Sequence, residues 1–135
     1  MANLIYPLAK QSLLSQTPSI DFDTDTIKVA LVTGAYTYSA SHQYYSSVSA
    51  SVVGTPATLT NKTVTEGVFD ADDATFTSVT GNQVTKILIF KDTGTASNSP
   101  LIALFDSAAA GLPITPNGGN ITIAWSNDAP RIFRI

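Results

Sequence analysis

The chain has 135 residues, no cysteine and a net charge of −3, and only 13% of its residues are charged. This length suits one domain over residues 1–135, and the lack of cysteine excludes disulfides, thiolate metal sites and cysteine nucleophiles. The acidic balance argues against nucleic acid as a partner, and no apolar run approaches the ~20 residues of a membrane span. We therefore expect neither nucleic acid nor membrane as a partner.

The first part of the chain predicts one helix and one strand. Pro7 suits the first turn of a helix, so we expect a short helix from about residue 6 to residue 15. A loop rich in aspartate and threonine follows. Val29 and Leu31 then alternate with smaller or polar residues, which predicts a strand over 27–33 that stops at Gly34.

Residues 35–51 differ from the rest of the chain because they hold four of its five tyrosines, many serines and no charge. We expect an ordered connecting segment with one helical turn around 42–46. Tyrosine offers contact area at a small entropic cost, so these side chains are the candidates for an interface. They are Tyr36, Tyr38, Tyr44 and Tyr45. Packing on another protein, stacking on a sugar, and a local core beneath a long loop all remain open.

From residue 52 onward the pattern alternates between strands and turns. The predicted strands cover 57–60, 62–66, 74–79, 83–91, 100–106, 119–126 and 130–135. The run KILIF at 86–90 is apolar on both faces, so Leu88 should be central, and Trp125 should be buried. Strands at this spacing with hairpin turns predict a mainly β fold, namely a single-domain antiparallel β-sandwich or barrel with a short N-terminal helix.

Two acidic clusters are candidates for a cation site. Asp21, Asp23 and Asp25 have the spacing that opens a calcium loop, but the glycine and the acid that such a loop needs later are replaced by Thr26 and Val32. Turn-forming aspartates before a strand explain this cluster better. The second cluster consists of Asp70, Asp72 and Asp73. We expect no metal and no cofactor.

Catalytic patterns are equally weak. His42 is the only histidine and lies among serines without a nucleophile elbow, and Glu66 is the only glutamate. A glycosidase pair would therefore depend on one glutamate in a turn. We expect no catalytic residues and no enzymatic activity.

Several stretches together are similar to a known group of proteins. They are MANLIY, DTIKVALV, LTNKTVTEGVFDADDATFTSV, KDTGTASNSPLIALFD and GLPITPNGGNITIAWSNDAPRIFRI. The chain resembles the small structural proteins of tailed bacteriophages that are found among head and tail genes. This chain departs from the pattern of that group at residues 33–58 and at Pro7. The resemblance implies a virion component without enzymatic activity, and it brings no catalytic or metal residues.

This resemblance and the low charge favour a capsid cement (decoration) protein that stabilises the head lattice. Its expected partners are the major capsid protein or other virion subunits, and we expect a homo-oligomer with a trimer favoured. The start of the chain lacks the regions of a signal peptide, and assembly in the host cytoplasm fits the lack of cysteine. The alternatives are a neck or tail subunit and, from another class, a carbohydrate-binding β module that uses the four tyrosines and Trp125.

Overall fold

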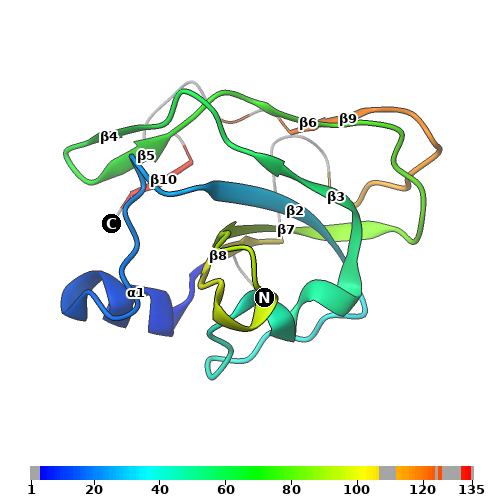
Figure 1. Ribbon diagram of the computed structural model, residues 1–135. Coiled ribbons are helices and arrows are strands. Elements are labelled where there is room, and N and C mark those ends of the chain that lie inside the picture. The colour runs from blue at the N-terminus through cyan, green and yellow to red at the C-terminus, as the bar shows by residue number, and fades with distance from the viewer. Residues whose placement is uncertain (1–3, 107–111, 124, 126–131, 135) are drawn as a thin grey trace.

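A five-stranded antiparallel sheet in the order β1-β8-β7-β2-β3 is the central element of the computed structural model, which describes residues 4–106, 112–123, 125 and 132–134. Its strands are β1 (Leu4–Ile5), β2 (Ile27–Thr33), β3 (Val52–Thr58), β7 (Val84–Lys91) and β8 (Leu101–Phe105). Two small antiparallel sheets, β10-β5-β4 and β6-β9, lie over one face of it (Figure 1). They consist of β4 (Thr63–Thr65), β5 (Val68–Asp70), β6 (Ala74–Phe76), β9 (Ile121–Ile123) and β10 (Phe133–Arg134).

The opposite face of the large sheet is covered by helical pieces (Figure 1). These are the helix α1 (Pro7–Ser15) and the short 3-10 turns η1 (Tyr45–Ser47), η2 (Ser49–Ser51) and η3 (Ala96–Asn98). The large sheet is therefore the middle layer of the domain. The fold is mainly β, as predicted, and its sheets pack face to face instead of closing into a barrel.

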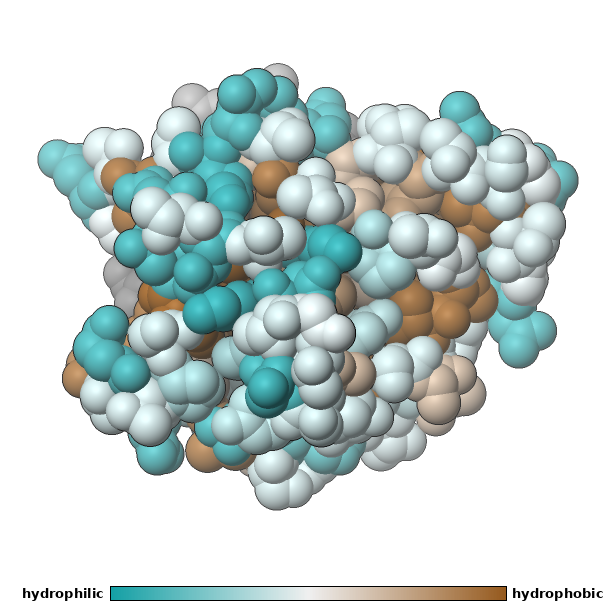
Figure 2. Space-filling view, in the orientation of Figure 1, coloured by the Kyte–Doolittle hydropathy of each residue, from teal (hydrophilic) through white to brown (hydrophobic). Residues whose placement is uncertain are grey.

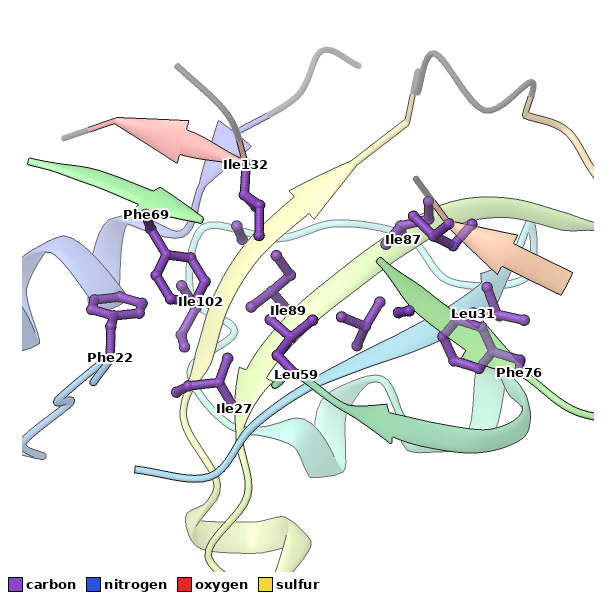
Figure 3. Packing of buried hydrophobic residues seen from close by; sticks show 14 of the residues in the cluster. Phe22, Ile27, Leu31, Leu59, Phe69, Phe76, Ile87, Ile89, Ile102 and Ile132 are labelled. Atoms are coloured by element: carbon purple, nitrogen blue, oxygen red, sulfur yellow. The ribbon is translucent and has the colours of Figure 1, made fainter. Parts of the chain in front are cut away.

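Alternation along the strands divides the core into two clusters, one on each face of the large sheet. Val29 and Leu31 of β2 join the cluster that faces the small sheets, whereas Ala30 and Val32 join the cluster that faces the helical pieces. Figure 3 shows the first cluster, in which isoleucines of β2, β7 and β8 meet Phe69 and Phe76 of the small sheets. Both faces of β7 are covered, so Leu88 is fully buried as predicted.

The clearest sequence signals are confirmed. The predicted helix corresponds to α1, with Pro7 as its first residue and with Gln16 in the left-handed conformation at its end. The predicted strand over 27–33 is β2, and the predicted strand over 83–91 corresponds to β7. The C-terminal segment also pairs as expected, because β10 lies antiparallel to β5. The ends of the predicted strands at 119–126 and 130–135 lie partly outside the described residues.

Other predictions need correction. The strand predicted at 57–60 is β3, which begins at Val52 because the chain already pairs with β2 there. The strands β1 and β5 were not predicted. Trp125 is only half-buried, because it lies at the rim of the first cluster, where its indole N–H reaches the carbonyl of Asp72 at 3.1 Å.

The two edges of the large sheet are occupied or irregular. The edge of β8 is covered by β1 and, further along, by residues 43–45, where the Tyr45 N–H donates to the Ser99 carbonyl at 2.8 Å. The other edge strand, β3, contains Pro56 and has a register shift where it pairs with β2. Such features hinder the pairing of an edge strand with another chain.

Candidate functional site

The tyrosine-rich segment, residues 35–51, is packed onto the large sheet and does not form an open loop. Tyr36 is only 5% exposed and lies in the second core cluster beside Val32 and Leu88. Val48 of the same segment is also buried there. The segment therefore forms part of the core layer over that face of the sheet, which is one of the three roles considered for it.

A chain of hydrogen bonds fixes the start of this segment. The hydroxyls of Tyr6 and Tyr36 lie 2.8 Å apart, and the Tyr36 hydroxyl lies 2.8 Å from Nδ1 of His42. Burial raises the pKa of Tyr6 far above its ordinary value, and the hydrogen bond to Tyr36 adds to that rise. Burial also raises the pKa of Tyr36. The network therefore holds neutral phenols inside the domain and ties α1's first turn to the segment.

Ring stacking and backbone pairing fix the end of the segment. The ring of Tyr45 is stacked on that of Phe90, with centroids 4.1 Å apart. Tyr44 forms an isolated antiparallel bridge with Pro100. Tyr38 leans on Tyr6 with ring centroids 5.5 Å apart. Each of the tyrosines thus has a structural contact within the domain.

The interface candidates therefore differ in what they can offer a partner. Tyr36 is buried, whereas Tyr38, Tyr44 and Tyr45 are half-buried and keep part of their surface. Around them lie exposed uncharged residues, including Ser46 and Ser47. Figure 2 shows a face on which residues of intermediate hydropathy predominate, with hydrophobic residues visible in separate areas between them.

A hollow of about 270 Å³ lies beside the stacked rings. Lys28 and Asp92 form an ion pair across 2.7 Å at this hollow, which Tyr45 and Pro56 also line. The hydrogen bonds from Lys28 and from the Gly94 N–H lower the pKa of Asp92. The hollow thus combines an aromatic ring with fixed charged groups.

A second hollow of about 310 Å³ lies at the start of the segment. Tyr36, Thr37, Tyr38 and Lys86 line it. The Lys86 ammonium lies 3.5 Å from the carbonyl of Tyr36. This hollow therefore places the positively charged side chain of Lys86 next to two tyrosines.

Trp125 is separated from the tyrosines by the large sheet. It packs against the first cluster, near Phe105, with ring centroids 6.5 Å apart. Tyr38 and Tyr45 pack against the second cluster on the opposite face. The aromatic residues that were grouped for a sugar site thus form two separate sets.

The first acidic cluster is a turn. The carboxylate of Asp21 accepts the backbone N–H groups of Asp23 and Thr24 at 3.0 and 3.2 Å. Asp25 pairs with Lys91 at 2.9 Å and accepts the Asp21 N–H at 2.8 Å. Burial acts to raise the pKa of Asp25, but that hydrogen bond and the Lys91 ammonium outweigh burial and lower the pKa.

The second acidic cluster also braces the backbone. The Asp73 carboxylate accepts the Trp125 N–H at 3.0 Å, and the Asp72 carboxylate accepts a hydrogen bond from the Asn61 side-chain amide. Within the described ranges, no group of three or more acidic or histidine side chains is arranged to hold a metal ion.

The two residues weighed for catalysis lie in separate places. His42 is engaged with Tyr36, while the hydroxyls of Ser39 and Ser41 lie 2.9 Å from each other. Glu66 lies in the turn between β4 and β5. His42 therefore helps to hold Tyr36 in place through this hydrogen bond.

Lys28 and Asp92 were not predicted as site residues. Asp92 directly follows the predicted strand over 83–91, Lys28 lies within the predicted strand over 27–33, and the two are far apart in sequence. Only the pairing of β2 with β7, which sets Ile27 opposite Lys91, brings them together. The only local feature that could have indicated this pair is the charge of Lys28 within a mostly apolar strand.

No protein-family model matches the chain, and no curated protein matches it. In the part of the chain that the structure describes, no helix is both long and apolar enough to cross a membrane.

Proposed function

We propose that the protein is a structural subunit of a tailed-bacteriophage virion, and that it acts as a cement protein on the capsid lattice without catalysis. Its partners are the major capsid protein or other virion subunits, and it works as a homo-oligomer, with three copies favoured. Assembly takes place in the host cytoplasm. A neck or tail subunit is the alternative within the same class.

The observation that carries this proposal is the packing of residues 35–51 onto the sheet. The buried Tyr36 and the stacked Tyr45 hold the segment in one conformation, so its outer surface is organised before any partner binds. That surface is made largely of serine, alanine and tyrosine, without a charged residue. Interface centres exclude unpaired charge and favour tyrosine, so this surface suits a permanent protein contact.

The test is to add negative charge to that surface without disturbing the fold. Ser46 and Ser47 are exposed in η1, so Ser46→Asp with Ser47→Asp should leave the domain folded and lower its occupancy on particles by about tenfold. Thr77→Asp is the control for a charge placed elsewhere, because Thr77 is also exposed but follows β6 in the opposite layer. Occupancy is measured by quantitative mass spectrometry of particles assembled with each variant.

Circular dichroism serves as the folding control for all three proteins. Full occupancy of the Ser46/Ser47 variant would reject residues 35–51 as the contact. Wild-type protein found in low copy number at one vertex or along the tail would reject cement and support the neck or tail subunit.

A second candidate function is carbohydrate binding, favoured by the hollow beside Tyr45. A sugar ring stacks on an aromatic side chain, and the Lys28–Asp92 ion pair supplies hydrogen-bonding groups next to that ring. A glycan array tests it, with Asp92→Asn as the variant expected to lose binding. An array without any bound glycan would reject this candidate.

A further inference from the structure

Among the strands that the structure describes, β4 is an uncovered edge of its small sheet. The sheet order β10-β5-β4 puts β4 at one end of the sheet, and Figure 1 shows β5 between β4 and β10. All of its residues, Thr63, Val64 and Thr65, are exposed. Val64 keeps 46% of its surface, which makes it one of two exposed large hydrophobic residues in the described ranges.

The register of the hairpin directs backbone groups of β4 outward. Glu66 and Gly67 form the turn, both with positive φ (52° and 80°), as in the two-residue turns of tight hairpins. Thr65 pairs with Val68 next to this turn, and such a flanking pair exchanges both of its hydrogen bonds. Val64, the next residue along, therefore directs its N–H and C=O away from β5 and toward the open edge.

The sequence around Val64 is complementary to itself when reversed. In an antiparallel pair of two β4 strands centred on Val64, each Thr63 lies opposite Thr65 of the other copy. Lys62 then lies opposite Glu66 of the other copy, so opposite charges meet at both ends of the pair. Within each copy the amine of Lys62 also donates to the carbonyl of Asp25.

We propose that β4 is a docking edge for a second copy of this chain, which pairs with it antiparallel about a two-fold axis at Val64. The two copies exchange the N–H···O=C bonds of Val64 and form two Lys62–Glu66 ion pairs across the axis. This inference goes beyond the proposed function and does not depend on it. A contact of this kind is isologous and joins copies in twos, so it is distinct from any contact that closes a trimer.

The contrast with the other sheet edges supports this choice. The edges of the large sheet carry covering segments or a proline, whereas β4 has no proline and no register shift in its pairing. Proteins usually protect an exposed edge strand unless it has a partner.

The first test removes the outward N–H of Val64. Val64→Pro keeps the bonds between β4 and β5, because the lost N–H points away from β5, and proline is tolerated at such edge positions. Sedimentation equilibrium of the full chain from about 10 μM to about 1 mM should show a concentration-dependent dimer that Val64→Pro weakens at least about tenfold. Val64→Thr is the matched control, since it keeps the N–H and the β-branched shape and should still form the dimer.

The second test exchanges charges. Glu66→Lys places like charges opposite each other and should weaken the dimer, and so should Lys62→Glu. Mixing these two variants should restore association, because each then supplies the charge that the other lacks. A wild-type protein that stays monomeric to about 1 mM, a dimer that Val64→Pro leaves unchanged, or a mixture that associates no better than its components would each overturn the proposal.

Discussion

The ring of Tyr45 lies nearly parallel to the ring of Phe90, with an interplanar angle of 5° and centroids 4.1 Å apart. Phe90 belongs to β7 at the middle of the large sheet, whereas Tyr45 begins η1 in the tyrosine-rich segment. The stacked pair therefore attaches the segment to the most central strand. Burial, with a smaller contribution from the charge of Asp92, raises the pKa of Tyr45.

Removal of this ring should loosen the segment. Tyr45→Ala leaves a gap over Phe90 and should lower the free energy of unfolding by about 1–3 kcal/mol, less than for a fully buried ring. Tyr45→Phe keeps the stacked ring and should change it by less than about 1 kcal/mol. Urea unfolding monitored by circular dichroism measures both. A Tyr45→Ala protein as stable as the wild type would show that the stack contributes nothing.

The hydroxyl of Tyr36 should contribute more to the free energy of unfolding than that of Tyr6. Tyr36→Phe leaves both the Tyr6 hydroxyl and His42 Nδ1 without their partner, so we expect a loss of about 1–3 kcal/mol. Tyr6→Phe removes one end of the chain and leaves the Tyr36–His42 bond in place, so its cost should be smaller. The double variant should cost less than the sum, because the two hydroxyls share one bond. Strict additivity in denaturant unfolding would contradict the hydrogen-bond chain.

Alkaline pH should destabilise the domain through these phenols. The folded pKa values of Tyr6 and Tyr36 lie above the ordinary value of about 10 that the unfolded chain has. Their contribution is complete below pH ~10 and is lost as pH rises from there toward the folded pKa values, by up to about 1.4 kcal/mol per pH unit for each tyrosine. Unfolding free energies at several pH values above 9 measure this slope. The Tyr6→Phe variant should have a shallower slope, and equal slopes would exclude Tyr6 as a cause.

Local patterns sufficed for the elements whose own residues determine them. Pro7 marks the first turn of α1, and the apolar run at 86–90 reflects a strand covered on both faces. The strand β3 was mostly missed because Gly54 and Pro56 disfavour strands, and it forms only through its pairing with β2.

The candidate site depended on contacts that no local pattern contains. Tyrosine-rich composition identified residues 35–51, but the bond between Tyr6 and Tyr36 joins positions 30 residues apart. Likewise, Lys28 and Asp92 meet only because β2 and β7 are neighbours. Composition therefore identified the segment, whereas only the fold determines which of its tyrosines are buried.

Chelation should leave the domain unchanged. The carboxylates of Asp21 and Asp25 already accept backbone N–H groups, and Lys91 pairs with Asp25. These contacts stabilise the turn without an ion, so the melting temperature should be the same with and without EDTA. Differential scanning calorimetry measures it, and a clear drop with EDTA, reversed by added Ca²⁺, would establish a cation site there.

The same substitution at two leucines should separate core from surface. Leu88 is fully buried in β7 with neighbours on both sides in the sheet, whereas Leu14 near the end of α1 keeps 89% of its surface. Leu88→Ala removes apolar contacts and leaves a cavity in the second cluster, between the large sheet and the helical pieces, so it should lower the free energy of unfolding by about 2–5 kcal/mol. Leu14→Ala removes few contacts, and alanine favours helix, so the change should stay within about 0.5 kcal/mol. Urea unfolding of both variants under identical conditions decides the matter. A loss below about 1 kcal/mol for Leu88→Ala would mean that β7 is not the centre of the core.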